Sequence, residues 1–149
     1  SNDVSLAALF GAPYGSLTAN EVRQWTTFMN RVRNDVDYFV HLSKRHWGRR
    51  RPYYNEPRIT PCVQRLTSLA YPSGHAAIGH IFARVLSRLN PSRSAEFQRR
   101  GDQVGSDRVL GGVHHPTDIQ FGKELADRVF EVLVADPDFI REFNALPRR

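Results

Sequence analysis

Residues 71–91 read YPSGHAAIGHIFARVLSRLNP. Ser73 is of a type favoured at the N-cap of a helix, and Asn90-Pro91 is a pair that stops one. Between them, apolar residues recur at spacings of three and four, the period of one face of an α-helix. These residues are Ile78, Ile81, Phe82, Val85, Leu86 and Leu89. The stretch therefore predicts a helix that buries one face.

A longer helical segment precedes this stretch. Thr18 and Glu21 match a capping box, in which two side chains satisfy unpaired N–H groups at a helix start. The pattern predicts a helix from there to about His46. Its buried face is predicted to hold Val22, Trp25, Met29, Val32, Val36 and Phe39.

Two further long helices are predicted after it. Residues 93–110 suit a helix with Gly101 and Gly105 as weak points. A last long helix starts at about Pro116, a residue type that suits the first helical position, and ends at Asp136-Pro137, with a short terminal helix beyond. Its predicted core-facing residues are Phe121, Leu125, Val129, Val132 and Leu133.

Glycine and proline mark the segments between these helices. Residues 1–17 hold Gly11, Pro13 and Gly15 and predict an irregular N-terminal arm. Residues 48–61 predict a proline-rich loop, and a short helix is predicted around 62–69. Strand-like alternation is nearly absent. The sequence therefore predicts an all-α, compact helical bundle of about five to seven helices, formed by residues 18–149 as a single domain.

Composition sets the class of the protein. The chain has 149 residues, with 40% hydrophobic and 24% charged residues, which suits one globular domain. No apolar run approaches the roughly 20 residues of a membrane span, so no transmembrane segment is predicted. Cys62 is the one cysteine, which excludes a disulfide framework and a multi-cysteine zinc site.

Charge points to an anionic partner. The formal net charge is +6, and only Lys44 and Lys123 of the 21 basic residues are lysines. Arginine binds phosphate and carboxylate through a planar fork. A phosphate ester, a nucleic acid and an anionic surface all fit this balance, as does a solvated basic face without a partner.

Three clusters of polar residues lie at the breaks between helices. The first, Lys44 to Pro52, places five Lys or Arg residues within eight positions and suits a polyanion, a helix C-terminus or a nucleic-acid patch. The second is Pro72-Ser73-Gly74-His75. Its unpaired N–H groups at a helix start suit an anion, and His75 beside them suits a general acid, although a plain helix cap is the simpler alternative.

The third cluster is Arg108-x5-His114-x3-Asp118. A carboxylate beside an imidazole fixes its tautomer, and such a histidine can act as a nucleophile. Arg108 offers a fork for phosphate oxygens. Metal binding by His114, His115 and Asp118 is an alternative that the neighbouring arginine disfavours. Helix capping by Thr117 and Asp118 is another.

Together the clusters resemble the signature of the type 2 phosphatidic acid phosphatase superfamily. Its three parts appear here in order, as Lys44-x6-Arg51-Pro52, Pro72-Ser73-Gly74-His75 and Arg108-x5-His114-x3-Asp118. The superfamily includes class A bacterial acid phosphatases, lipid and isoprenyl-diphosphate phosphatases, and vanadium haloperoxidases. The resemblance spans residues 44–118, about half the chain, and implies an acid phosphatase/vanadium haloperoxidase-like helical fold.

The resemblance also implies a role for each matching residue. Five residues would bind the phosphoryl group: Lys44, Arg51, Ser73, Gly74 and Arg108. His114 would attack phosphorus to form a phosphohistidine, Asp118 would orient His114, and His75 would protonate the leaving alcohol. No metal or other cofactor is needed in this scheme. The sequence leaves open which histidine starts protonated, because both have anionic neighbours.

One position departs from the family pattern. Asp107 precedes Arg108 where the family usually has serine, and Ser106 lies one residue earlier. Asp107 would weaken phosphate binding if it pointed inward. His115, beside the aligned His114, is also ambiguous.

The function expected is a metal-independent phosphatase of phosphate monoesters, acting on a phosphorylated small molecule or lipid. Alternatives are a membrane-surface lipid or isoprenyl-diphosphate phosphatase and a vanadium-dependent haloperoxidase. Vanadate would be an inhibitor in the first case and the cofactor in the last. A basic nucleic-acid-binding helical module is the non-enzyme alternative, but no nucleic acid is expected as an obligatory partner. A homo-oligomer and a periplasmic or secreted location, with a signal already removed, are further expectations.

Overall fold

The computed structural model describes residues 4–11 and 17–148, and every regular element in these ranges is helical. The elements in chain order are α1 Leu6–Phe10, α2 Ala19–Trp47, α3 Pro52–Asn55, α4 Gly74–Leu89, the 3₁₀ turn η1 Pro91–Arg93, α5 Ser94–Leu110, α6 Pro116–Ala135 and α7 Pro137–Ala145. The predicted all-α fold class is confirmed. None of these helices combines the length and hydropathy needed to cross a membrane.

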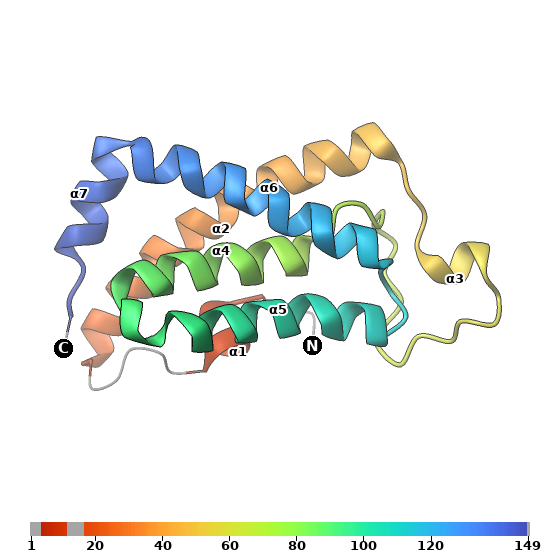
Figure 1. Cartoon of the computed structure of the whole chain (residues 1–149), viewed down its shortest axis with the longest axis horizontal. Helices are drawn as coiled ribbons and strands as arrows, with labels where there is room; N and C mark the ends of the chain where they lie inside the picture. The colour runs from red at the N-terminus through yellow and green to blue at the C-terminus, as the bar shows by residue number, and fades with distance from the viewer. Residues whose placement is uncertain (1–3, 12–16, 149) are drawn as a thin grey trace.

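α4 is the central helix of the bundle (Figure 1). It packs against α2, α5 and α6, and its predicted apolar face is buried apart from Leu89, which is half-buried. Trp25 and Met29 of α2 are completely buried in the same core. α7 closes the core at the end where α2 begins (Figure 1). There the centre of the Phe139 ring lies 5.3 Å from the centre of the Phe28 ring.

Local signals set the helix ends as expected. Thr18 and Glu21 form the predicted capping box, with the Thr18 N–H donating to Glu21 Oε2 over 2.7 Å. α2 ends at Gly48, whose φ of +61° is a backbone conformation that glycine adopts without strain. Ser73 is the N-cap of α4, as predicted. Local hydrogen bonding therefore fixes where the long helices start and stop.

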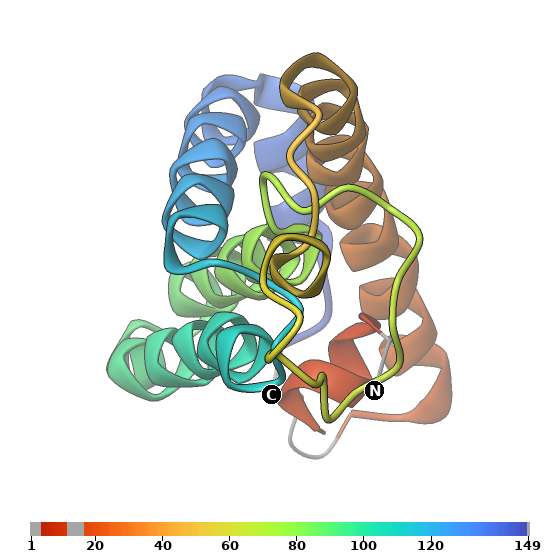
Figure 2. The same cartoon turned by 90° about the vertical axis from the view of Figure 1, so that its right-hand side faces the viewer.

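The four long helices alternate in direction, so the end of α2, the start of α4, the end of α5 and the start of α6 lie at one end of the molecule. Figure 2 looks at this end, where α3 lies in front of the bundle. Residues that are far apart in the sequence are brought together there.

A close approach holds α4 and α6 in place at this end. A Cβ atom built on Gly122 would lie only 2.6 Å from the Ser73 carbonyl oxygen, so only glycine fits at this contact. The Ser73 backbone N–H donates to the Asp118 carbonyl oxygen over 2.9 Å. The starts of the two helices are therefore joined directly.

The segments between the helices differ from the prediction in two places. No helix forms around 62–69, so that prediction is wrong. The segment is instead tied to α3, since the Tyr53 hydroxyl donates to the Leu66 carbonyl oxygen over 2.8 Å. The predicted loop 48–61 contains α3, which starts at Pro52 because proline is already in a helical backbone conformation.

The N-terminal arm also contains order that was not predicted. α1 lies within it, and Leu6 and Leu9 are buried in the core, so an entirely irregular arm was wrong. Gly11 ends α1 with a φ of +69°. The other two predicted breaks, Pro13 and Gly15, lie outside the described residues.

Three residues predicted to face the core are exposed instead. They are Phe39, Phe121 and Val132. Each lies at the edge of an apolar stripe on α2 or α6, where the described chain offers no further helix to cover it. The weak points expected at Gly101 and Gly105 do not interrupt α5. A Cβ on Gly101 would lie 2.8 Å from the Gly79 carbonyl oxygen, so this glycine permits close packing against α4.

Candidate active site

The three sequence motifs meet where the long helices end. Lys44 lies in the last turn of α2, and Arg51 caps the start of α3. Ser73 caps α4, Arg108 lies in the last turn of α5, and Asp118 lies in the first turn of α6. Lys44 and Arg108 therefore lie at helix C-termini, where the helix dipole favours a cation.

Burial singles out this set of residues. Six polar or charged residues of the described chain are buried, and every one belongs to a sequence motif. They are Lys44, Arg51, Ser73, Arg108, His114 and Asp118. Three of them are cationic residue types and only one is a carboxylate. Buried charge without a partner is costly, so this balance favours an anionic ligand.

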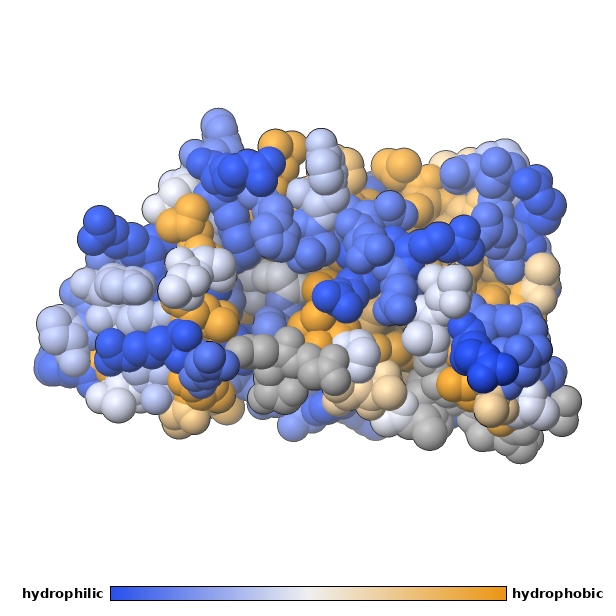
Figure 3. Space-filling model, turned by 180° about the vertical axis from the view of Figure 1, so that it is seen from behind, coloured by the Kyte–Doolittle hydropathy of each residue, from blue (hydrophilic) through white to orange (hydrophobic). Residues whose placement is uncertain are grey.

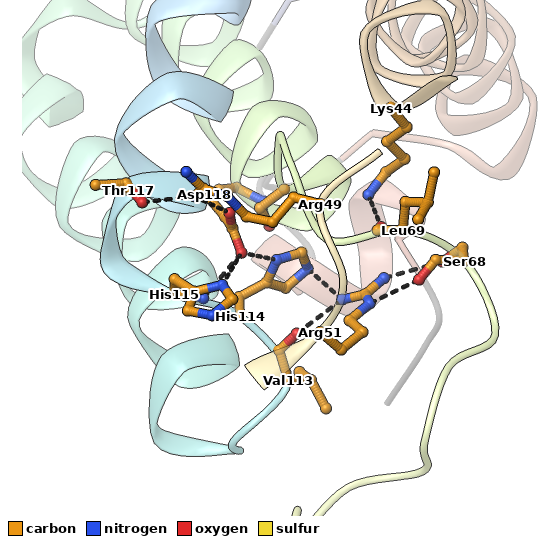
Figure 4. A network of polar contacts seen from close by, with 12 residues as sticks. Lys44, Arg49, Arg51, Ser68, Leu69, Val113, His114, His115, Thr117 and Asp118 are labelled. Carbon is orange, nitrogen blue, oxygen red and sulfur yellow. Dashed lines mark hydrogen bonds and ion pairs between the residues drawn. The ribbon is translucent and has the colours of Figure 1, made fainter. Parts of the chain in front are cut away.

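His114 lies between α5 and α6 and is held from both sides of its ring (Figure 4). Its Nδ1 lies 3.1 Å from Asp118 Oδ2, and its Nε2 lies 2.7 Å from Arg51 Nη1. A guanidinium cannot accept a hydrogen bond, so Arg51 donates and Nε2 carries a lone pair. Nδ1 therefore carries the ring hydrogen and donates it to Asp118. These contacts select the neutral tautomer that carries its hydrogen on Nδ1. The unprotonated nitrogen, Nε2, lies on the side of the ring away from the carboxylate.

The environment keeps this imidazole neutral. Burial lowers the pKa of His114, and the hydrogen bond to Asp118 opposes that effect. The charges of Arg51 and Lys44 lower it further, and the resulting pKa is about 4. Above that pH the ring is neutral, and Nε2, which accepts from Arg51, is its basic and nucleophilic nitrogen.

Asp118 is fully buried and accepts several hydrogen bonds. The His115 backbone N–H donates to Oδ2 over 2.8 Å, and Arg49 Nη1 donates to Oδ1 over 2.8 Å. Burial alone would raise the pKa of Asp118, but the bonds from His114, His115 and Arg49 outweigh it and hold the pKa well below its usual range. Asp118 is therefore an anion throughout the working pH range.

Arg49 is a site residue that the sequence motifs did not single out. Its Nη1 also donates to Thr117 Oγ1 over 2.7 Å, and its guanidinium lies 4.6 Å from the centre of the Tyr71 ring. Sequence reasoning counted Arg49 only as one member of a basic cluster. No signal in the sequence separates Arg49 from the neighbouring Arg45 and Arg50 of that cluster.

Arg51 is anchored to the loop before α4. Its Nε donates to the Ser68 carbonyl oxygen over 2.8 Å, and its Nη2 donates to Ser68 Oγ over 2.9 Å. Its Nη1 also donates to the Val113 carbonyl oxygen over 2.9 Å. Burial lowers the pKa of Arg51, and the nearby charge of Arg108 lowers it further. No sequence motif predicted Ser68 as the partner of Arg51.

Lys44 is the cation whose charge is most sensitive to pH. Its Nζ donates to the Leu69 carbonyl oxygen (Figure 4). Burial lowers the pKa of Lys44, and the charge of Arg51 lowers it further, while Asp118 and Asp37 act in the opposite direction. The resulting pKa is about 7, so the charge on Lys44 changes near neutral pH.

Arg108 has donors that the described chain does not satisfy. It is 4% exposed, and its Nε and Nη2 have no hydrogen-bond partner among the described residues. Burial lowers its pKa, but an arginine stays charged at any working pH. Buried donors without a partner are rare in native proteins. An oxyanion with several acceptor oxygens would satisfy them.

The start of α4 adds further donors. The first N–H groups of an α-helix have no partner within the helix, and the buried Ser73 hydroxyl accepts from one of them, the Ala76 N–H, over 3.2 Å. Gly74 is the first residue of α4, and His75, the second, is half-buried. This helix start therefore presents N–H groups next to a histidine, an arrangement that suits an anion.

The two ambiguous residues occupy distinct places. Asp107 is exposed while Arg108 is buried, so the unusual carboxylate points away from the cluster. His115 is half-buried at the N-cap of α6, and its Nδ1 lies 3.2 Å from Asp118 Oδ2. The His114 ring contacts both Asp118 and Arg51, whereas the contact given by the His115 ring is to Asp118.

The same geometry bears on the metal alternative. His114 and His115 direct ring nitrogens at one oxygen of Asp118, and Arg49 holds the other oxygen. No group of three or more His, Cys, Asp or Glu side chains within 4–11 and 17–148 is placed to hold a metal ion. The arrangement offers a nucleophilic nitrogen beside several cations, which suits the transfer of a phosphoryl group.

Comparison with known proteins gives one family and several relatives. Residues 36–126 match the sequence model of the PAP2 superfamily. A non-specific acid phosphatase of Providencia stuartii is 29% identical over 91% of this chain and 55% of its own length. An acid phosphatase of Zymomonas mobilis is 32% identical over 68% of this chain and 40% of its own length.

A non-specific acid phosphatase of Salmonella typhimurium is 31% identical over 77% of this chain and 48% of its own length. The chain thus spans about half the length of these relatives.

Proposed function

Because the chain belongs to the PAP2 superfamily, we propose that it is a metal-independent phosphatase that hydrolyses phosphate monoesters through a phosphohistidine intermediate. The observation that carries the proposal is the burial of three cationic residues and one carboxylate around a neutral, oriented His114. The acid phosphatases to which the chain is similar support the same activity.

Binding of a phosphate ester would neutralise the positive charge of the three buried cations. Lys44, Arg51 and Arg108 would hold the phosphoryl oxygens, and the N–H groups at Ser73 and Gly74 would add hydrogen bonds. Arg51 Nη1 already lies 2.7 Å from His114 Nε2, so an oxygen bound to this arginine would lie near the nucleophile. Fixed cations would stabilise the charge of the transition state, as metal ions do in other phosphoryl-transfer enzymes.

The first step would be an in-line attack. The Nε2 lone pair of His114 forms a bond to phosphorus as the bond to the ester oxygen breaks, and His75 gives its proton to the leaving alcohol. Asp118 keeps the hydrogen on Nδ1 and stabilises the positive ring that forms. This division needs His114 neutral and His75 charged, and the low pKa of His114 meets the first condition.

The second step would release phosphate. A water molecule gives a proton to His75 and attacks phosphorus, and the bond between phosphorus and Nε2 breaks. His114 returns to its neutral form, and His75 is again protonated for the next cycle. The protein therefore ends the reaction in the state in which it began.

The other candidate activities make different predictions. A lipid or isoprenyl-diphosphate phosphatase would prefer esters presented in vesicles. A haloperoxidase would oxidise bromide with hydrogen peroxide once vanadate is bound, because vanadate has the shape and charge of phosphate. A nucleic-acid-binding module would show steeply salt-dependent binding to DNA without hydrolysis.

Hydrolysis of p-nitrophenyl phosphate in the presence of EDTA tests the proposal. We expect activity that EDTA leaves unchanged and that vanadate inhibits competitively. Activity lost with EDTA and restored by a divalent metal would contradict metal independence. Absence of hydrolysis, together with vanadate-dependent bromide oxidation, would favour the haloperoxidase.

A location outside the cytoplasm and assembly into a homo-oligomer remain predictions. The first is supported by the resemblance to class A acid phosphatases and is tested by fractionation of the producing cell. The second is tested by light scattering of the purified chain.

A further inference from the structure

An apolar surface runs along the face shared by α2 and α6. Six of the eight large hydrophobic residues that the described chain exposes lie on these two helices. They are Tyr38, Phe39, Leu42, Trp47, Phe121 and Val132. Figure 3 shows hydrophobic side chains along the upper edge of the molecule, where α2 and α6 run. Exposed apolar residues gathered on one face often mark a binding surface.

The end of this surface next to the candidate active site is a cavity with aromatic walls. Its volume is about 220 Å³, and Trp47, Tyr71 and Phe121 lie around it. The Trp47 and Tyr71 ring centres are 5.9 Å apart, and the Tyr71 and Phe121 ring centres are 5.1 Å apart. The three rings therefore form one continuous wall.

This wall is joined directly to the phosphate-binding residues. Tyr71 and Pro72 both line the cavity and lead straight into Ser73. Phe121 lies one helical turn after Asp118 on α6. Arg49 connects the two parts, because its guanidinium binds Asp118 and lies over the Tyr71 ring.

The size and exposure of the cavity indicate what it could hold. A cavity of roughly 150 Å³ with apolar walls is large enough for benzene, so this one has room for a one- or two-ring aromatic group. Trp47 is 62% exposed and Phe121 is 44% exposed, so both rings present faces on which a flat group could stack. The charged residues that line the cavity are Glu124 and Arg128.

We propose that the cavity between Trp47, Tyr71 and Phe121 is a subsite for the leaving group, and that it selects monoesters whose alcohol carries an aromatic ring. The inference rests on the proposed phosphatase function. His75, the proposed acid for the leaving alcohol, follows Tyr71 by four residues and Pro72 by three. Because Tyr71 and Pro72 directly precede the helix start that carries His75, the leaving group of a bound ester is the ligand that we assign to this wall.

The test compares two substrates in four proteins. We would measure kcat/KM for 2-naphthyl phosphate and for glycerol 2-phosphate in the wild type, Trp47→Ala, Phe121→Ala and Tyr38→Ala. The difference in intrinsic reactivity of the two esters cancels when each variant is compared with the wild type. Tyr38 is a matched control, since it is an exposed aromatic on the same helix about 13 Å from Trp47.

The expected result is a ratio of naphthyl to glycerol activity that falls about tenfold in Trp47→Ala and Phe121→Ala and is unchanged in Tyr38→Ala. An unchanged ratio in all variants, with both esters hydrolysed, would overturn the subsite and leave the phosphatase proposal standing. An equal fall in Tyr38→Ala would also overturn it, since the effect would not be local. Hydrolysis of neither ester by the wild type would overturn both proposals.

A binding measurement checks the same subsite without turnover. Trp25 is fully buried and Trp47 is exposed, so a change in tryptophan emission on ligand binding reports mainly on Trp47. We expect phenylphosphonate to change the emission and methylphosphonate to leave it nearly unchanged. Equal responses to the two phosphonates would contradict stacking on Trp47.

Discussion

Two of the histidine–aspartate pairs within the described residues can be compared directly, and one of the two is suited to catalysis. His114 and Asp118 form one pair, and His80 of α4 and Asp127 of α6 form the other, with His80 Nε2 2.8 Å from Asp127 Oδ1. Each carboxylate also contacts an arginine, Arg49 in the first pair and Arg84 in the second. Residue types and contacts are thus nearly the same in the two places.

The pairs differ in the ring nitrogen that faces the carboxylate and in exposure. His114 bonds Asp118 through Nδ1, so Nε2 at the tip of the ring faces the cation of Arg51, whereas His80 bonds Asp127 through Nε2 itself. The side chains of the first pair are 2% and 0% exposed, and those of the second are 17% and 42% exposed. A histidine–aspartate pair therefore becomes a candidate nucleophile through its orientation and surroundings.

The largest expected effect comes from removing each histidine in turn. His114→Ala should lower kcat/KM for p-nitrophenyl phosphate by about 10⁴-fold, because it removes the proposed nucleophile. His80→Ala should stay within about twofold of the wild type and lower the free energy of unfolding by about 1 kcal/mol or less. Steady-state kinetics and urea denaturation provide the two readouts. Similar activity losses in the two variants would mean that the pairs are not functionally distinct.

Replacing each carboxylate should have the next largest effect. Asp118→Asn can donate a hydrogen bond to His114 Nδ1 and so favour the wrong tautomer, and we expect a loss of about 10³-fold or more. Asp127→Asn should leave kcat/KM within about twofold. NMR of the imidazole nitrogens would show whether the hydrogen has moved to Nε2 in the first variant. A fully active Asp118→Asn protein would rule out the orienting role.

The pH dependence of kcat/KM should reflect the titration of two residues of the site, His114 and Lys44. kcat/KM should fall below about pH 4, because His114 becomes protonated, and above about pH 7, because Lys44 loses its charge. Lys44→Arg should move the alkaline limb to higher pH, because arginine does not titrate in this range. Ionisation of the substrate affects the pH profiles of the two proteins equally, so it does not contribute to the difference between them. An unmoved alkaline limb would exclude Lys44 as its source.

Replacing the arginine beside each pair, Arg49 or Arg84, should have the smallest effect. Arg49→Gln removes a cation from Asp118, so the carboxylate attracts a proton on His114 more strongly and the pKa of His114 rises. The acid limb should then move up by about half a pH unit, with a loss of activity of only a few fold. Arg84→Gln is the matched control and should leave the limb in place. A shift in both variants would point to the overall charge of the protein instead.

Much of this arrangement followed from local sequence signals. Thr18, Ser73 and Pro116 mark helix starts through their own chemistry, and the structure starts α2, α4 and α6 there. The charged residues of the motifs lie next to these signals, so placing the helix ends also placed the motifs. Their roles in catalysis remain predictions until the experiments above are done.

Long-range contacts could not be predicted in the same way. The bond between Arg49 and Asp118 joins residues 69 positions apart and depends on how the segment after α2 lies against the start of α6. The exposure of Phe121 depends on what covers α6, which its spacing along the helix does not specify. Leu66 is tied to Tyr53 through a hydroxyl, a contact that no periodic pattern encodes.

The central claim is that His114 carries the phosphoryl group. Rapid quenching of the wild type with a labelled aryl phosphate, followed by peptide mapping under alkaline conditions, tests it most directly, because phosphohistidine is labile in acid. We predict one phosphoryl group on Nε2 of His114, formed before the product phosphate appears. Label on His75 or His115, or product formation without any labelled protein, would contradict the account.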